Sequence, residues 1–319
     1  MMSRLIIELP FNITCIDVFL FRPRLACCYL VRGGDQYGLI ETGTTNSVAS
    51  LLNVLKYKGV GVEDLRYIMP THVHMDHAGG AGALMQRFPN ARLVIHPRGA
   101  RHMVDPAKLW QGAAAVYGEE TLERVYGRPV PVDESRIIVA EDGWELDLDG
   151  RKLLFIDTPG HARHHYSIYD AESSGFFSGD TFGISYRETD SDNGAFVMPT
   201  TTPVQFDPEA WNSSLDRYLE YRPERMFPTH FSMVQDVERL SGRLRSAISD
   251  YVEIARRHAH AEDLHAAIKS ELIDFTLTQL RGHNCPLPEA ACRGLIEMDM
   301  ELNAQGLAVW LTTAASARR

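Results

Sequence analysis

Three imidazoles and one carboxylate fall within six positions of the chain, in the segment Thr71-His72-Val73-His74-Met75-Asp76-His77. A chain still extended at His72 and His74 would point both rings to one side, because side chains alternate along a strand. A turn into a helix beginning near Ala78 can fold Asp76 and His77 back toward the same space. Imidazole and carboxylate are the usual non-thiolate ligands of zinc and related divalent metals. The segment therefore predicts a metal site, and a polar surface loop is the alternative.

Three later turns each place one ligand-type residue directly after a strand-like run. The runs and their turns are Leu153 to Asp157 before Thr158-Pro159-Gly160-His161, Phe176-Phe177 before Ser178-Gly179-Asp180, and Met226-Phe227 before Pro228-Thr229-His230. Each turn puts its ligand at the end of a strand. We therefore predict that His161, Asp180 and His230 complete the ligand set.

Other histidines compete with this assignment. His164 and His165 follow His161 closely enough to bind the same metal, but we predict that His165 begins the next strand or supports the site. His96 precedes Pro97 at a strand end without a partner motif, so we predict a structural role for it as well. Four more histidines lie in a presumed helical region and are predicted surface residues: His258, His260, His265 and His283.

The elements that position these residues begin with short strand-like runs, which indicate a meandering sheet up to about Glu41. Apolar residues then recur at helical spacing between Val48 and Leu55, and Gly59 follows a plausible helix end. The stretch from Pro97 to about Pro131 has a mostly helical pattern between turn residues. We interpret it as an insertion that shapes a substrate pocket.

A long polar segment from Gly183 to Phe206 contains three consecutive threonines before Pro203 and is typical of a functional loop. The pair Asp207-Pro208 supplies an N-cap and a first-turn proline for a helix toward Tyr221.

The chain changes character after His230, where helical patterns cover residues 237–258, 263–280 and 288–302. We predict two domains, a metal-binding domain over residues 1–236 and a helical domain over residues 237–319. The final MDMELNAQGLAVWL pattern suggests a helix, a glycine turn and a β-like run, as in a winged-helix-like module. Acidic and basic residues nearly balance in this region, so packing, homodimerisation or a place at the active-site rim is expected there, and nucleic-acid binding is not.

The composition is that of a globular protein, with 45% hydrophobic and 23% charged residues, and the net charge of −10 offers no general attraction to nucleic acid or anionic membranes. Polar residues such as Glu8 and Asp17 interrupt the N-terminal apolar runs before a signal or membrane span can form. Five cysteines without a CxxC pair fit reduced thiols. A cytoplasmic location follows as an expectation, and the adjacent Cys27 and Cys28 are predicted to pack within a strand.

The ordered motifs HxHxDH, TPGH, SGD and a late histidine resemble those of the metallo-β-lactamase superfamily over roughly residues 5 to 235. The resemblance implies an α+β fold, a four-layer αββα sandwich of two β-sheets with helices on both outer faces. It implies a two-metal site at one edge, and its roles carry over to the matching positions. His72, His74 and His161 match the first metal site, Asp76, His77 and His230 match the second, and Asp180 matches the bridging carboxylate.

Two positions depart from the family pattern. The early turn is Glu41-Thr42-Gly43 where the family often has Asp-Thr-Gly, and Thr229 stands before the last histidine where glycine is frequent. Neither change touches a predicted ligand. Glu41 is expected to alter the support around the histidines.

Two divalent ions, zinc first and iron or manganese as alternatives, can hold a shared water as hydroxide at neutral pH. The expected activity is therefore hydrolysis of an ester, thioester or lactone of a small molecule, with Asp76 orienting the water or accepting its proton. Tyr186 is a candidate oxyanion donor and Arg187 a candidate anchor for an anionic group.

Within the superfamily, the long chain with helices at its end most resembles the glyoxalase II-like group, although the glutathione-binding motifs of those thioesterases are not located here. An iron-dependent persulfide dioxygenase is the alternative enzyme, because its ligand motif overlaps. A non-enzymatic signalling effector that uses the C-terminal module is the alternative outside catalysis.

Overall fold

The structure is a computed structural model that describes residues 5–201 and 204–317, so Thr202 and Pro203 of the predicted functional loop lie outside the described residues. The chain forms two compact units. The first runs to Asp157 and includes His164–Gly179 and Glu224–Met233. The second comprises Thr158–Arg163, Asp180–Pro223 and the chain from Val234 onward. The predicted domain boundary at residues 236 and 237 stays a prediction.

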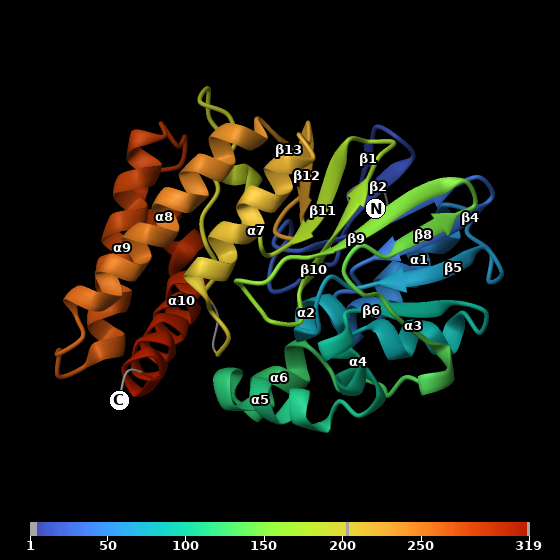
Figure 1. Cartoon of the computed structure of the whole chain (residues 1–319), viewed down its shortest axis with the longest axis horizontal. Coiled ribbons are helices and arrows are strands. Elements are labelled where there is room, and N and C mark those ends of the chain that lie inside the picture. The colour runs from blue at the N-terminus through green and yellow to red at the C-terminus, as the bar shows by residue number, and fades with distance from the viewer. Residues whose placement is uncertain (1–4, 202–203, 318–319) are drawn as a thin grey trace. The chain divides into compact units, whose positions relative to one another are not determined.

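The first sheet of the first unit has seven strands in sequential order (Figure 1). They are β1 (Ile6–Leu9), β2 (Ile13–Asp17), β3 (Cys27–Gly33), β4 (Gln36–Ile40), β5 (Leu65–Met69), β6 (Arg92–Ile95) and β7 (Ile137–Val139). The first four strands form the predicted antiparallel meander. The later strands pair in parallel, and parallel neighbours need long crossovers. These crossovers contain η2 (Thr45–Ser47) with α1 (Val48–Tyr57), then α2 (Met75–Ala78) with α3 (Ala81–Arg87), and finally three further helices before η3 (Glu134–Arg136).

The second sheet runs, within the first unit, in the order β12-β11-β10-β9-β8. Its strands are β8 (Glu145–Leu148), β9 (Arg151–Asp157), β10 (Tyr166–Asp170), β11 (Gly175–Gly179) and β12 (Arg225–Pro228). Apolar side chains of both sheets pack into one buried core that includes Tyr29, Ile40, Phe155 and Phe177. Cys27 and Cys28 are buried in β3, where burial raises the pKa of the Cys28 thiol. The predicted α+β class is confirmed, since the chain forms two mixed sheets together with helices and ends in a helical region.

Three helices between β6 and β7 form the predicted helical insertion: α4 (Pro97–Val104), α5 (Ala107–Tyr117) and α6 (Glu119–Val125). His96 begins this segment, since its Nδ1 accepts a 3.0 Å hydrogen bond from the Arg98 amide and caps α4. Its Nε2 lies 2.9 Å from Asp157 Oδ1 at the end of β9. His96 therefore has the structural role that the sequence predicted.

The second unit is mainly helical, with α7 (Pro208–Glu220), α8 (Val237–Arg257), α9 (Leu264–Gly282) and α10 (Glu289–Ala317), together with η4 (Arg187–Thr189) and the short β13 (Val234–Gln235). Asp207 caps α7 as predicted, accepting hydrogen bonds from the amides of Glu209 and Ala210 at 3.1 and 3.0 Å. Helices α9 and α10 lie side by side (Figure 1).

The predicted turn and β-like run after Gly306 are wrong, because α10 continues through this glycine. Ala304 and Leu307 are fully buried on either side of it. Packing of these residues therefore outweighs the weak helix propensity of glycine, which amounts to about 1 kcal/mol. Within residues 5–201 and 204–317, no helix is long and apolar enough to span a bilayer.

Weak binding of nucleic acid is an expected result for the whole protein. The chain carries a net charge of −10, and protein contacts with phosphates need basic side chains. Fluorescence anisotropy with labelled duplex DNA and RNA should show no saturable binding at moderate salt. Tight binding that weakens steeply as salt rises would contradict this prediction and would favour the signalling effector.

Candidate metal centre

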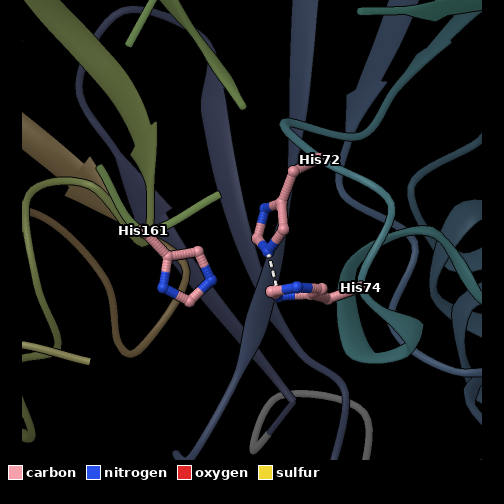
Figure 2. Close-up of side chains that lie close together, drawn as sticks. All are labelled: His72, His74 and His161. Atoms are coloured by element: carbon pink, nitrogen blue, oxygen red, sulfur yellow. Dashed lines mark hydrogen bonds between the residues drawn. The ribbon is translucent and has the colours of Figure 1, made fainter. Parts of the chain in front are cut away.

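His72 and His74 lie between the end of β5 and the start of α2, as the sequence predicted. His72 Nε2 is 2.8 Å from His74 Nδ1, and Figure 2 shows the two rings joined by this contact. The other ring nitrogen of His72, Nδ1, lies 3.1 Å from Thr71 Oγ1. Because the Thr71 hydroxyl donates its hydrogen to Glu41, its oxygen is available to accept from His72 Nδ1. This tautomer leaves the lone pair of His72 Nε2 facing His74.

Asp76, His77 and His230 form a group in the same unit, and their ligand atoms all lie within 4.8 Å of one another. Asp76 Oδ2 is 3.6 Å from His77 Nε2 and 3.4 Å from His230 Nε2. One carboxylate and two imidazoles at these distances are suitable ligands for zinc, iron or manganese.

The opposite nitrogens of these two rings are held by the protein. His230 Nδ1 donates to the Leu25 carbonyl at 2.8 Å, and His77 Nδ1 lies 3.0 Å from Glu41 Oε1. A carbonyl can only accept, so the proton of the neutral His230 ring is on Nδ1 and the lone pair of Nε2 faces Asp76. Metal-binding histidines are typically oriented in this way by a carbonyl or carboxylate. The donor set therefore fits a divalent metal.

His161 and Asp180 belong to the second unit, and His161 is the third residue drawn in Figure 2. His161 Nδ1 donates to the Thr200 carbonyl at 2.7 Å, and its Nε2 lies 3.5 Å from Asp180 Oδ2. The ring is thus oriented as His230 is, with one nitrogen on a carbonyl and the other toward a carboxylate. Asp180 is bonded directly to Gly179, the last residue of β11.

Glycines shape the two turns that carry these residues. Gly160 has a φ of +135°, and a Cβ there would come within 2.4 Å of the Trp211 backbone. Gly179 has a φ of +50°, and a Cβ there would lie 2.4 Å from Thr71 Oγ1 and 2.5 Å from His165 Nε2. The glycines of the TPGH and SGD motifs are therefore required by close packing as well as by backbone conformation.

His164 and His165 lie near the first histidines without joining a potential ligand group. The ring centroids of His165 and His72 are 5.0 Å apart, and those of His164 and His74 are 5.4 Å apart. Among the described residues, no group of three or more potential metal ligands includes either of them. This arrangement agrees with the supporting role expected of His165.

Tyr186 and Arg187 lie at the start of η4 in the second unit. The Tyr186 hydroxyl is 3.1 Å from both carboxylate oxygens of Asp299 on α10. Arg187 Nη1 lies 3.3 Å from Asp190 Oδ2. Both side chains therefore have partners within their own unit.

Sequence reasoning missed an aromatic group on the insertion. Tyr126, directly after α6, is buried, and its ring lies 5.9 Å from that of Phe21 and 5.2 Å from that of Tyr117. Burial raises the pKa of Tyr126 well above its usual value, and the neighbouring Tyr117 and Asp76 raise it further. Tyr117 and Tyr126 of the insertion thus form an aromatic group with Phe21, which lies between β2 and β3, and no motif in the sequence marks this group.

Residues 22–230 match the family model described as the metallo-beta-lactamase superfamily. The chain belongs to this superfamily. Its motifs, its two sheets and the clustered histidines and aspartates are features that this metallo-β-lactamase-fold protein has in common with the family.

Two curated relatives show how the chain compares with individual members. The metallo-beta-lactamase fold-containing protein ST1585 of Sulfurisphaera tokodaii is 32% identical over 66% of this chain and 75% of its own length. An N-acyl homoserine lactonase of Bacillus thuringiensis is 31% identical over 60% of this chain and 74% of its own length. The crystal structure of the metallo-beta-lactamase family protein TTHA1429 from Thermus thermophilus has a TM-score of 0.65 at 19% identity, covering 98% of this chain and 93% of that one. This last likeness concerns the fold alone.

Proposed function

We propose that this protein is a binuclear metal-dependent hydrolase that cleaves an ester, thioester or lactone of a small molecule. The observation that carries the proposal is the group formed by Asp76, His77 and His230. Both of its imidazoles are oriented through Nδ1, so that Nε2 faces the carboxylate. Such preorganisation is typical of a metal site.

The proposed ligand set follows the family roles. His72, His74 and His161 would hold one ion, Asp76, His77 and His230 the other, and Asp180 would bridge the two. Zinc is the proposed metal, because neutral imidazoles and carboxylates suit it, and iron and manganese accept the same donors. The position of Asp180 directly after β11 and the orientation of the His161 ring toward its carboxylate support the assignment.

Divalent ions in such a centre supply Lewis acidity and an activated water near neutral pH. Oδ2 of Asp76 faces the two imidazoles of its group and would bind the metal, and the Asp76 carboxylate would also orient the attacking water and accept its proton. Tyr186 is the proposed donor to the developing oxyanion. Its hydroxyl would have to exchange Asp299 for the substrate oxygen.

A lactone is the first substrate class to test, because a relative that is 31% identical over 60% of this chain is an N-acyl homoserine lactonase. The cytoplasmic location expected from the sequence remains a prediction.

Metal removal tests the proposal directly. Protein purified without added metal should contain about two transition-metal ions per chain, and a strong chelator should abolish hydrolysis until zinc is restored. Elemental analysis and a panel of lactones, thioesters, esters and phosphodiesters would measure both properties. Unchanged activity in metal-free protein would refute the hydrolase, whereas bound iron with dioxygen-dependent persulfide consumption would identify the alternative enzyme.

A further inference from the structure

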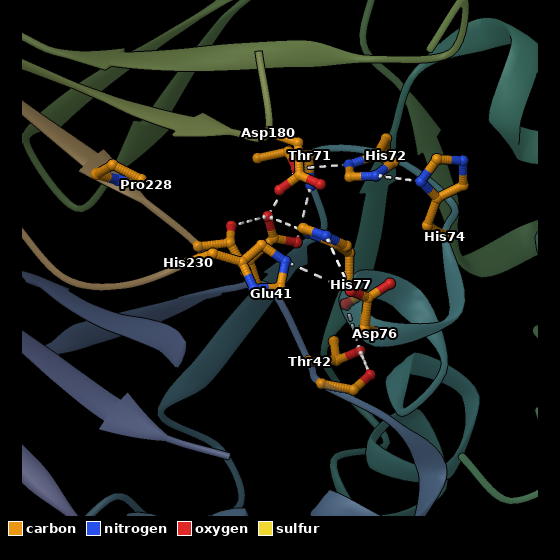
Figure 3. Close-up of polar contacts among 12 residues, drawn as sticks. Glu41, Thr42, Thr71, His72, His74, Asp76, His77, Asp180, Pro228 and His230 are labelled. Atoms are coloured by element: carbon orange, nitrogen blue, oxygen red, sulfur yellow. Dashed lines mark hydrogen bonds and ion pairs between the residues drawn. The ribbon is translucent and has the colours of Figure 1, made fainter. Parts of the chain in front are cut away.

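Glu41 is a buried carboxylate at the end of β4 that accepts hydrogen bonds from four donors. Its side chain is 1% exposed, and its backbone has a φ of +64°, in the left-handed region. The donors are the Thr71 amide at 3.1 Å, the Thr71 hydroxyl at 2.6 Å, the Thr229 hydroxyl at 2.9 Å and His77 Nδ1 at 3.0 Å. Figure 3 shows Glu41 with Thr71 and His77 around it. Four donors leave little capacity in a carboxylate, so its geometry is strongly determined.

Two predicted ligands, His77 and His72, are oriented through this network. Glu41 Oε1 accepts a hydrogen bond directly from His77 Nδ1. The ring proton is therefore on Nδ1, and Nε2 has the lone pair. The same oxygen accepts a hydrogen bond from the Thr71 hydroxyl. Because the hydroxyl hydrogen is used in this bond, the Thr71 oxygen can accept a hydrogen bond from His72 Nδ1. One carboxylate therefore selects the tautomers of two rings, one by a direct hydrogen bond and one through a hydroxyl.

Thr229 connects a third predicted ligand to the same oxygen. Its hydroxyl reaches Glu41 Oε1 across 188 positions of sequence, and the next residue is His230. Thr229 is also the position where the superfamily often has glycine, and Glu41 the position where it often has aspartate. The larger carboxylic acid and the added hydroxyl are thus partners in one hydrogen bond.

We propose that Glu41 and Thr229 are a coupled positioning pair, in which Glu41 selects the metal-binding tautomer of His77 and Thr229 fixes the His230 turn to the same carboxylate. The proposal rests on the ligand assignment of the proposed function, although the tautomer selection itself does not depend on a reaction. A glutamine at position 41 cannot reproduce the network, because its amide NH₂ group would face a donor at one of the two oxygen positions.

Ring-nitrogen NMR of metal-free protein labelled with ¹⁵N-histidine tests the tautomer. The parent should show His77 with its proton on Nδ1, assigned by comparison with a His77→Asn variant. In Glu41→Gln the proton should move substantially to Nε2 or the two tautomers should mix. A role limited to general stability would leave the tautomer unchanged, and that result would overturn the proposal.

Metal affinity tests the coupling. Competition with a chromophoric chelator should show zinc binding about 10- to 100-fold weaker in Glu41→Gln, the usual cost of losing a partner that orients a ligand. Thr229→Val, which keeps the side-chain shape, should weaken binding by a smaller factor. The double variant should bind about as well as Glu41→Gln alone, because the hydroxyl has then already lost its acceptor. Fully additive losses would contradict the pairing.

Thr14→Val is the matched control. Thr14 is also buried in the first unit and its hydroxyl also donates to a glutamate, Glu8, at 2.9 Å, outside this network. This variant should keep the parent's zinc affinity and His77 tautomer, and circular dichroism would show that all variants fold. Parental tautomer and affinity in Glu41→Gln would refute the positioning pair even if the protein hydrolyses lactones. The predicted tautomer shift in a protein without hydrolytic activity would instead refute the proposed function alone.

Discussion

Replacing Asp180 by alanine should lower metal content and hydrolytic turnover together, with turnover falling by at least about 100-fold. Loss of a residue that merely orients a ligand costs about 10- to 100-fold, and Asp180 is proposed to bind both ions. Its carboxylate is 4% exposed, and Oδ2 lies 3.5 Å from His161 Nε2. Alanine would remove the anionic charge that offsets two dications. Elemental analysis and steady-state kinetics on the same preparation would measure the two effects.

Asp157 provides a matched control for this experiment. It is also an aspartate at the end of a strand, and it also pairs with a histidine, with Oδ1 2.9 Å from His96 Nε2. No metal role is assigned to it, so Asp157→Ala should retain the parent's metal content. His165→Ala should do the same. Full metal and activity in Asp180→Ala, or severe metal loss in His165→Ala, would show that the ligand assignment is wrong.

Asp170→Ala should destabilise the fold by about 3–5 kcal/mol, the usual cost of leaving one member of a buried ion pair alone. Arg151 Nε and Nη2 lie 3.0 and 2.5 Å from the two oxygens of Asp170. Arg151 Nη1 also donates to two carbonyls of the first sheet. One belongs to Phe11, in the turn between β1 and β2, and the other to Arg32 on β3. The guanidinium would remain buried with only the half-exposed Glu172 carboxylate nearby, 3.8 Å from Nε. Urea unfolding followed by circular dichroism would measure the loss.

Lys152→Ala is the control for this experiment, because it removes ion pairs that are exposed to solvent. Lys152 follows Arg151 on β9 and pairs with Glu145 and Asp147, but its side chain is 53% exposed. Exposed pairs of this kind contribute little, because water screens them. Lys152→Ala should therefore leave the unfolding midpoint close to that of the parent. An equal loss in both variants would contradict the importance given to burial of the Arg151 pair.

The candidate metal ligands could be predicted from the sequence because several of them lie close together in it. His72, His74, Asp76 and His77 fall within six consecutive positions, and each later candidate follows a strand-like run. Local patterns of this kind predict the positions of strand ends, and polar residues at those ends stand out. The helix beginning at Pro208 could also be predicted, since its N-cap Asp207 and first-turn proline are adjacent in the sequence.

The hydrogen-bond network around Glu41 could not be predicted from the sequence in this way. Glu41 and Thr229 are 188 positions apart, and only the pairing of strands within the first unit brings them to a hydrogen-bond distance of 2.9 Å. The sequence marked both residues as departures from a family pattern, but nothing in it indicated that the two departures are in contact. The error at Gly306 has a related cause. Local propensity suggested a turn, whereas burial of Leu307 within the helical region favours a continuous α10.

The insertion of α4, α5 and α6 has a consequence for how this fold can vary between related chains. The inserted helices leave the first sheet after β6 and return at β7, and these strands are direct parallel partners with Leu93 opposite Ile137. The strand pairing is therefore complete whatever the length of the connection between them. Natural selection or protein engineering can therefore change the length and sequence of this connection while β6 and β7 stay paired. The turns that carry the candidate metal ligands follow other strands, so such changes leave the residues of those turns unaltered.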